Sequence, residues 1–266
     1  MSDSMNSPLQ STSSLKVGEL IVNYNAPRGL PNLPSEHLLL LVHGAGGSSR
    51  HWNPFIAELG SSCFPIAIDL PGHGKTDGWV SESIVAAANF LAEFLSELGV
   101  ERPVCYIGQS MGGLIGMQFA LAHSAWVERL VLISTAARIQ LHPDFLSQAI
   151  TGQWDLASLR QSFAPEVPEH LKDVVLNEFQ HTRCQTGASD FMGVGRIDLS
   201  EAISALRMPT LILTGDDDVI ISPRKSKILQ RQIPESRLVI VPGAGHYLNV
   251  EKPAILAEEI ERFLQE

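Results

Sequence analysis

The sequence predicts an α/β protein with a mostly parallel, doubly wound sheet and a helical segment inserted between two strands. Short apolar runs of strand-like composition alternate along the chain with longer amphipathic segments of helical period. One long stretch, residues 139–206, contains amphipathic pieces but no strand-like run. At 266 residues the chain is long enough to bury a sizeable core as one unit of this class.

The expected strands are short runs rich in Leu, Ile and Val. The run HLLLLVHG at 37–44 is apolar without alternation, which is typical of a central strand covered on both faces. The other strands are expected at 20–26, 64–70, 104–110, 129–134, 210–215 and 237–243, with a further short strand at 15–17 that turns at Gly18. Helical patterns are expected between and after them, at 83–99, 112–123, 222–233 and 252–266.

The chain divides into a tail, a core and a cap. Residues 1–14 are polar and Ser-rich, and we expect them to form a mobile tail. The sheet and its flanking helices are expected in 15–138 and 207–266. The segment 139–206 is expected to form an all-helical cap that lies over the strand ends, because it interrupts the alternation of strands and helices.

Composition excludes several classes of partner. The net charge of −10 provides no basic stripe for a nucleic acid backbone. No apolar run approaches the ~18 residues of a membrane span, and the polar N-terminus lacks the apolar region of a secretory signal. The three cysteines are odd in number and widely spaced, which disfavours a disulfide framework. A soluble, cytoplasmic protein acting on a small molecule is therefore expected, and the oligomeric state is not predicted.

The sequence Gly108-Gln109-Ser110-Met111-Gly112 follows an apolar strand and opens a helical pattern. A Gly-x-Ser-x-Gly motif alone is a weak signal, since an ordinary tight turn can have the same composition. At a strand-to-helix junction, however, the two glycines allow the elements to approach closely and the serine hydroxyl is exposed at a sharp turn. Ser110 is therefore the candidate nucleophile.

A serine nucleophile needs a base, and His246 is the candidate. It lies in the Gly-rich stretch VPGAGHYLNVEKP, after the last expected strand and before the last helix. Loops at the carboxyl ends of strands are where open α/β sheets bind ligands. His123, His142, His170 and His181 lie on helical or polar segments, where a solvated histidine is the usual outcome.

Two strand-end loops supply supporting groups. The run LLLLVHGAGGSS allows the backbone amide of Ala45 to lie beside that of Met111, so that the two form an oxyanion hole. Its glycines also fit a simple turn. His43 is expected to brace this loop, and Asp69 and His73, in DLPGHGKT, are expected to be structural supports rather than catalysts.

Taken together, five motifs resemble those of the α/β-hydrolase superfamily, from about residue 16 to the end of the chain. They are His43–Gly46, Asp69–Gly74, Gly108–Gly113, Gly215–Asp218 and Gly243–His246. The resemblance implies the α/β-hydrolase fold, a cap domain at the helical insertion and a catalytic triad. RLVLISTAARI and GQSMGGLIG also show a weaker similarity to 3-oxoadipate enol-lactonases and small carboxylesterases.

The acid of the triad is expected among Asp216, Asp217 and Asp218, which follow a strand end. Gly215 permits the chain to turn there, so the third aspartate is the one expected to swing back over the sheet edge. The family has a Gly-x-x-Asp pattern whose aspartate is catalytic, and this pattern assigns the role to Asp218. The loop one strand earlier, ISTAARI, contains no carboxylate.

These residues predict a cofactor-independent serine hydrolase acting on an ester, lactone or thioester of a small apolar acid. No zinc-like spacing and no Gly-x-Gly-x-x-Gly after a strand is present, so neither a metal nor a dinucleotide is implied. Two alternatives remain open: a lyase or carbon–carbon bond hydrolase with the same triad, and a ligand receptor on a hydrolase scaffold. The lack of the family's HGxGPG proline disfavours carbon–carbon cleavage. Substrate contacts are expected in the cap, above all from Trp154 and Phe163, among the candidates Phe145, Trp154, Leu159, Phe163, Phe179, Phe191 and Met192.

Overall fold

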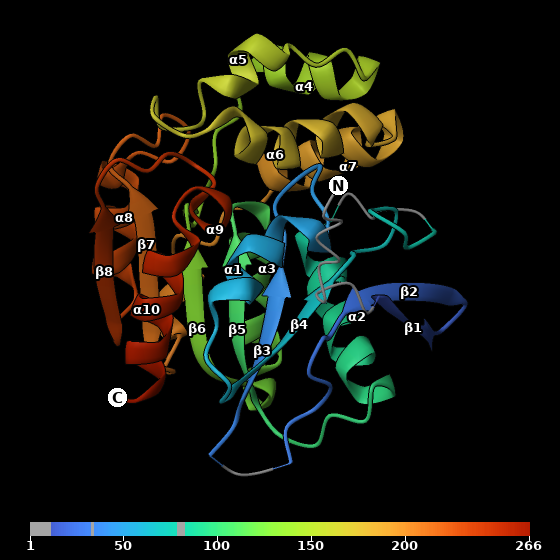
Figure 1. Cartoon of the computed structure of the whole chain (residues 1–266), viewed down its shortest axis with the longest axis vertical. Coiled ribbons are helices and arrows are strands. Elements are labelled where there is room, and N and C mark those ends of the chain that lie inside the picture. The colour runs from blue at the N-terminus through green and yellow to red at the C-terminus, as the bar shows by residue number, and fades with distance from the viewer. Residues whose placement is uncertain (1–11, 33–34, 79–82) are drawn as a thin grey trace, which may run out of the picture.

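The computed structural model describes residues 12–32, 35–78 and 83–266, which form one eight-stranded sheet flanked by helices (Figure 1). The strands lie in the order β1-β2-β4-β3-β5-β6-β7-β8. Strand β2 pairs antiparallel with β1 and β4, and the other five neighbouring pairs are parallel. The strand bounds are β1 Thr12–Val17, β2 Leu20–Asn25, β3 His37–Val42, β4 Cys63–Ile68, β5 Val104–Gln109, β6 Val127–Ile133, β7 Thr210–Gly215 and β8 Ser236–Val241. The predicted fold class, with its mostly parallel sheet, is confirmed.

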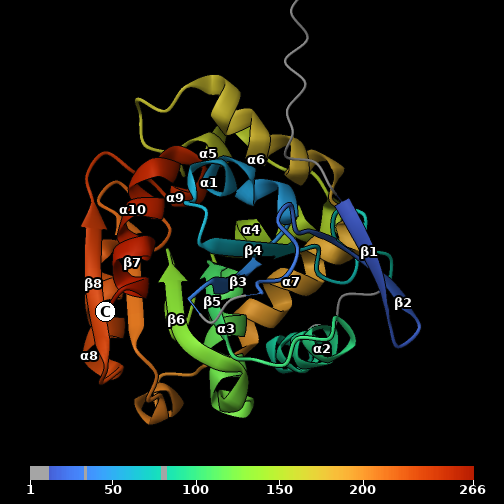
Figure 2. The ribbon, with the colours of Figure 1, turned by 60° about the horizontal axis from the view of Figure 1, so that its bottom comes forward.

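Helices cover both faces of this sheet, so its central strands are buried on both sides (Figure 2). One face packs against α2 (Ile84–Glu97), α3 (Met111–Ala122) and α8 (Pro223–Gln232), and the other against α1 (Asn53–Glu58), α9 (Leu248–Glu251) and α10 (Pro253–Leu264). Within β3, Leu40 belongs to the core on the first side and Leu39 to the core on the second. This double covering explains the apolar run without alternation.

The antiparallel edge begins earlier than the sequence predicts. Strand β1 starts at Thr12, which lies opposite Asn25 of β2, so residues 12–14 belong to the sheet and not to the expected tail. The alternating exposed and half-buried residues of β1 explain the error, because a half-polar edge strand resembles a polar tail in composition. The remainder of the expected tail, residues 1–11, lies outside the described residues.

Four helices between β6 and β7 stack above the ends of the parallel strands in Figure 1. They are α4 (Pro143–Thr151), α5 (Leu156–Arg160), α6 (Glu169–His181) and α7 (Cys184–Arg196). We call this group of helices the cap. Both ends of the 139–206 segment pack into the main core, through Ile139 on one side and Ile203 on the other. Short 3₁₀ turns complete the described chain at Ser49–Trp52, Ser124–Trp126 and Ala202–Ala205.

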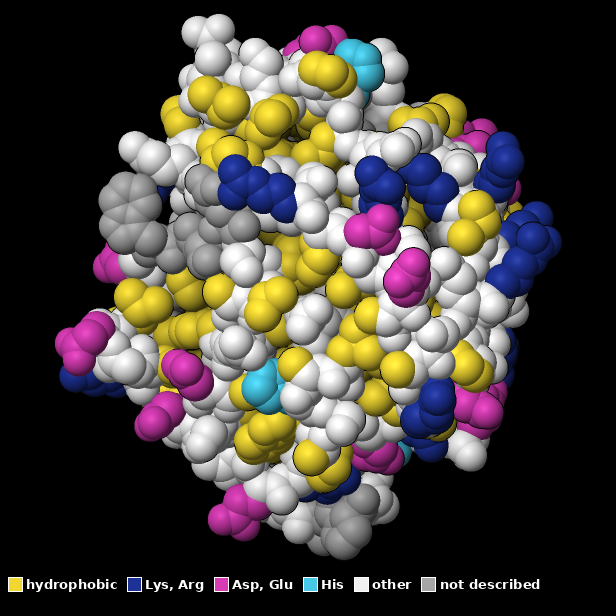
Figure 3. All heavy atoms as spheres, turned by 180° about the vertical axis from the view of Figure 1, so that it is seen from behind, with side chains coloured by type: hydrophobic (Ala, Val, Ile, Leu, Met, Phe, Trp, Pro, Cys, Tyr) yellow, Lys and Arg dark blue, Asp and Glu magenta, His cyan; other side chains and the backbone are white. Residues whose placement is uncertain are grey.

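The surface mixes charged and apolar side chains. In the view of Figure 3, Asp and Glu side chains lie scattered among basic and apolar ones. Among the described helices, none has both the length and the apolar composition needed to cross a membrane. The buried strands and the cap above them therefore define where a concave site can form, at the carboxyl ends of β3, β5, β7 and β8.

Candidate active site

Ser110 lies at a sharp turn between the end of β5 and the start of α3. Its backbone has φ 52° and ψ −113°, a left-handed conformation that L-residues other than glycine rarely adopt. The turn is held by a hydrogen bond from the Ser110 amide to the Ile133 carbonyl, 2.9 Å, and by one from Thr135 Oγ1 to the Ser110 carbonyl, 2.8 Å. Strain of this kind clusters at functional sites because the surrounding structure must enforce it.

Glycines on either side make this turn possible. A Cβ at Gly108 would collide with the backbone of Gly112, and a Cβ at Gly112 would collide with the Val42 carbonyl of β3. Strand β5, helix α3 and strand β3 therefore approach closely around Ser110, as the motif predicts.

The structure brings His246 and Asp218 together. The ring nitrogen Nδ1 of His246 lies 3.0 Å from Asp218 Oδ2 and 3.2 Å from Oδ1, and both residues are only 3% exposed. The amides of Ile220 and Ile221 also donate to Asp218 Oδ1, at 2.9 and 2.8 Å. Burial by itself would raise the pKa of Asp218, but the His246 ring and the donated hydrogen bonds outweigh burial and lower it.

The neighbouring aspartates lie elsewhere. Asp216 and Asp217 are exposed, and Asp216 Oδ1 accepts a hydrogen bond from the Gly243 amide at 2.7 Å. Within the described chain, Asp218 is the carboxylate that contacts the His246 ring. Ser110 and His246 line the same cavity, although in the described structure the Ser110 hydroxyl makes no hydrogen bond. Such contacts often tighten only when substrate binds.

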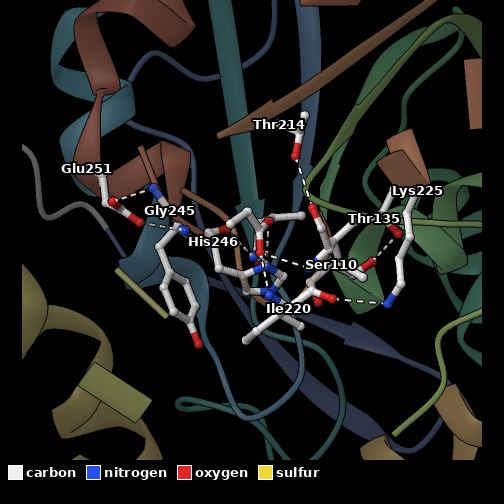
Figure 4. Close-up of polar contacts among 12 residues, drawn as sticks. Ser110, Thr135, Thr214, Ile220, Lys225, Gly245, His246 and Glu251 are labelled. Carbon is white, nitrogen blue, oxygen red and sulfur yellow. Dashed lines mark hydrogen bonds and ion pairs between the residues drawn. The ribbon is translucent and has the colours of Figure 1, made fainter. Parts of the chain in front are cut away.

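Glu251, which the sequence analysis missed, supports the loop that carries His246. The residue is 7% exposed. Its carboxylate accepts hydrogen bonds from the amides of Gly245, Tyr247 and Ala164, at 2.8, 2.9 and 3.0 Å. The first two amides flank His246 (Figure 4). The third belongs to the cap segment after α5. A glutamate on a short helix five residues after the histidine is the signal that could have identified it.

The loop containing Gly44 and Ala45 runs beside Ser110. A Cβ built on Gly44 would collide with Gln109 Oε1 and lie 3.3 Å from the Ser110 Cβ, so a larger residue there would force the neighbouring side chains to shift. In the described part of the chain, the amides of Ala45 and Met111 donate no hydrogen bond, and Met111 is the first residue of α3, where amides have no intrahelical partner. Both amides are free to bind a ligand oxygen.

The buried His43 braces this loop, as predicted. His43 Nδ1 lies 2.8 Å from the Gly44 carbonyl, and the Leu70 amide donates to His43 Nε2 at 3.3 Å. Since Nε2 accepts, the proton lies on Nδ1 and the ring is neutral. Burial and the neighbouring His73 lower the pKa of His43 to about 4. Asp69 is also structural, because it accepts from the amides of Ser49 and Lys75 at 2.7 and 2.9 Å.

A cap residue that the sequence analysis missed, Asp190 of α7, completes this brace. Its Oδ2 lies 2.8 Å from His73 Nε2 and accepts a hydrogen bond from the Gly46 amide, also at 2.8 Å. Burial lowers the pKa of His73, but the Asp190 carboxylate outweighs burial and raises it above its ordinary value of 6.5. The signal in the sequence was an aspartate on the apolar face of an amphipathic helix, beside Phe191 and Val194.

A cavity of about 440 Å³ lies between the cap and the sheet. Ser110, His246 and Ala45 line it on the sheet side, and Phe145, Phe179 and Phe191 line it on the cap side. Its volume lies within the range of small-molecule sites. In the described part of the chain, no three His, Cys, Asp or Glu side chains lie where they could hold a metal ion together.

Trp154 and Phe163, the predicted substrate contacts, do not line this cavity. Trp154 packs edge-on against Phe179, with ring centroids 5.0 Å apart, and Phe163 packs against Tyr247 at 4.8 Å. Each therefore supports a lining ring from behind. Helical spacing indicates that an aromatic residue is buried but not which side of the cap it faces, so a substrate contact of either ring stays a prediction.

Comparisons with known proteins agree with this architecture. The model of the alpha/beta hydrolase family matches residues 39–259. An uncharacterised protein of Mycobacterium tuberculosis is 29% identical over 262 residues, covering 85% of this chain and 74% of that protein. The pimeloyl-[acyl-carrier protein] methyl ester esterase of Neisseria meningitidis is 25% identical over 224 residues, covering 77% of this chain and 84% of the esterase. The enol-lactonase of Burkholderia xenovorans has a similar structure, with a TM-score of 0.86 and 23% identity over 96% of this chain and 100% of the lactonase chain. Since the family model matches most of its length, the chain belongs to the alpha/beta hydrolase family.

Proposed function

We propose that this enzyme is a cofactor-independent serine hydrolase that cleaves an ester, lactone or thioester of a small, mainly apolar acid. The observation that carries the proposal is the strained backbone of Ser110 in a cavity that it shares with His246, whose Nδ1 contacts the buried Asp218. A nucleophile, a base and an orienting acid are the three parts that such chemistry requires.

In the proposed reaction His246 accepts the Ser110 proton while Ser110 Oγ attacks the substrate carbonyl carbon. The amides of Ala45 and Met111 hold the negative charge that develops on the carbonyl oxygen. The tetrahedral intermediate then breaks its bond to the leaving group, which takes the proton from His246, and an acyl-enzyme remains. Water, deprotonated by His246, attacks the acyl carbon, and Ser110 leaves with the proton.

Asp218 has the positioning role in this scheme. Its contact with Nδ1 fixes the tautomer in which Nε2 is free to accept the Ser110 proton, and its negative charge stabilises the imidazolium that follows. The three phenylalanine rings of the cap side support an apolar acyl group. The esterase relative from Neisseria, at 25% identity, also supports ester cleavage.

The test combines turnover with labelling. The enzyme should hydrolyse p-nitrophenyl esters of short-chain acids, and Ser110→Ala should lower kcat by a factor on the order of 10⁶. A fluorophosphonate should add one group to the peptide that carries Ser110, as measured by mass spectrometry. Ser158→Ala is the matched control, because Ser158 lines the same cavity and should leave labelling unchanged. Full activity of Ser110→Ala, or a label on another residue, would rule out the acyl-enzyme.

A further inference from the structure

The cavity wall carries a lysine that the proposed chemistry does not use. Lys225 is the third residue of α8, and it lines the cavity together with Ser110 and His246. Figure 4 shows its side chain extending toward the Ile220 carbonyl, to which Nζ donates a hydrogen bond at 3.1 Å. The residue is half-buried, and a carboxylate pairs with it nowhere in the described chain.

The charge of the cavity differs from that of the whole molecule. The chain has 29 acidic and 19 basic residues and a net charge of −10. Among the described residues that line the cavity, however, none is Asp or Glu, and Lys225 is the one Lys or Arg. The other polar lining groups are neutral amides and hydroxyls, such as Gln140, Gln161 and Ser162, together with histidines.

The Lys225 ammonium has hydrogen-bond donors that the described protein does not use. An ammonium has three N–H donors, and the Ile220 carbonyl accepts one of them. Removing a cation partly from water without a counter-charge costs free energy, which an anionic ligand would recover. Lysine is a compact point charge, whereas phosphate recognition favours the bidentate fork of arginine or several donors. One ammonium in a mainly apolar cavity therefore suits one carboxylate.

We propose that Lys225 binds a carboxylate that the substrate carries apart from its scissile bond. The substrate class is then a half-ester or thioester of a dicarboxylic acid, or a lactone with a carboxylate side chain. This inference rests on the proposed function, because it takes Ser110 as the reacting group in the same cavity. The apolar lining contacts the chain between the two ends of the substrate, and Lys225 fixes its charged end.

Lys225 also has a structural contact, which the test must separate from binding. The Ile220 carbonyl that it contacts belongs to the segment whose amides donate to Asp218. Loss of that contact alone would disturb Asp218 and slow every substrate equally. Loss of a carboxylate site would slow only substrates that carry the carboxylate.

The experiment compares monoethyl esters of C4 to C8 dicarboxylic acids with the matching ethyl esters in which a carboxamide replaces the free carboxylate. The wild-type enzyme should prefer the carboxylate member of at least one pair in kcat/KM. In Lys225→Met that preference should fall by about 10- to 100-fold, the size of a charge-assisted hydrogen bond, with most of the change in KM. Lys225→Arg should retain part of the preference. Lys227→Met is the control, because Lys227 is exposed on the same helix. This substitution removes the same net charge as Lys225→Met and should leave the preference for the carboxylate ester intact.

A binding measurement keeps the two proposals distinguishable. The C4 to C8 dicarboxylates should bind to Ser110→Ala, as measured by calorimetry, and should lose affinity when Lys225→Met is added, whether or not any ester is hydrolysed. If Lys225→Met lowers kcat/KM equally for both esters of each pair, or if dicarboxylates bind equally well without Lys225, this inference is wrong. The serine mechanism would then remain in place. If dicarboxylate binding depends on Lys225 but the fluorophosphonate does not label Ser110 of the wild-type enzyme, the proposed function is wrong and the carboxylate site remains.

Discussion

Asp190 of the cap and His73 of the core form a buried pair, with 2.8 Å between Oδ2 and Nε2 and side chains that are 0% and 1% exposed. The same Oδ2 accepts a hydrogen bond from the amide of Gly46, one residue after Ala45. The other oxygen, Oδ1, is buried and has no hydrogen-bond partner among the described residues. The cap is therefore joined by one carboxylate to the loop that carries a proposed oxyanion donor.

Asp190→Asn should lower kcat more than it raises KM, because the substitution weakens the acceptor that positions the Gly46 amide and the neighbouring Ala45. Displacing a catalytic group by about 1 Å can cost up to about 10²-fold in rate. Steady-state kinetics on a chromogenic ester would measure the two parameters. Asp144→Asn, at an exposed cap position, is the control and should change neither. A rise in KM alone would assign Asp190 to substrate binding.

The same pair predicts a dependence of stability on pH. The pKa of His73 is raised above 6.5 in the folded protein. Its protonation therefore stabilises the fold fully below about pH 6.5, and this contribution is lost as the pH rises through the folded pKa. Asp190→Ala should cost about 3 kcal/mol where the pair is charged, because it leaves a buried cation alone. Denaturant unfolding at several pH values would measure this, and a cost that grows with pH would contradict it.

Sequence alone identified the residues whose position follows from local chain geometry. Ser110 follows a strand and opens a helix, and His246 and Asp218 follow the last two strands of a parallel sheet. Strand ends meet at one edge in this fold, so short local motifs were sufficient to bring these side chains into one region. The structure adds the distances between His246 and Asp218 and the strain at Ser110.

Residues that act across the chain could not be predicted in this way. Gly46 and Asp190 are 144 positions apart, and Ala164 and Glu251 are 87 apart. No local pattern states which carboxylate will meet which amide, because that depends on how the cap is seated on the sheet. The facing of the cap aromatics depends on the same seating: Trp154 and Phe145 are both apolar cap residues, but of the two only Phe145 lines the cavity.

Asp218 and Asp216 should respond very differently to the same substitution. Asp218→Asn removes the charge beside His246 Nδ1 and allows the wrong tautomer, which should lower kcat by about 10⁴-fold. Asp216→Asn loses only an exposed contact with the Gly243 amide and should change kcat far less. Stopped-flow or steady-state assays of both variants would check this. If Asp216→Asn lowers kcat by a comparable factor while Asp218→Asn is nearly normal, Asp216 and not Asp218 is the acid of the triad.

Phe145 should control the length of the acyl chain. It is half-buried, lines the cavity and packs against Phe191, so Phe145→Ala should open space without exposing the main core. The variant should therefore gain kcat/KM on longer p-nitrophenyl esters relative to shorter ones. Trp154→Phe is the control, because Trp154 lies behind the lining and should affect the melting temperature more than the chain-length ranking. An unchanged ranking in Phe145→Ala would show that acyl chains bind elsewhere.

The backbone strain at Ser110 should make two inactive variants, Ser110→Gly and Ser110→Ala, differ in their free energy of unfolding. Its φ of 52° disfavours any residue with a Cβ, and strain of this kind costs about 1–3 kcal/mol, whereas glycine adopts the conformation freely. Glycine in turn loses about 0.5–1 kcal/mol through the greater entropy of its unfolded chain. Ser110→Gly should therefore be more stable than Ser110→Ala by about 1 kcal/mol, although both lack the nucleophile.

The matched control for this comparison is Ser147, an exposed residue within helix α4. No left-handed strain exists there, so Ser147→Gly should be less stable than Ser147→Ala by about 1 kcal/mol, the ordinary difference in helix propensity. Thermal and denaturant unfolding of the four variants would give both signs. If glycine is the less stable replacement at both positions, the turn at Ser110 stores no strain, and the exposure of its hydroxyl must be enforced by the contacts with Ile133 and Thr135 alone.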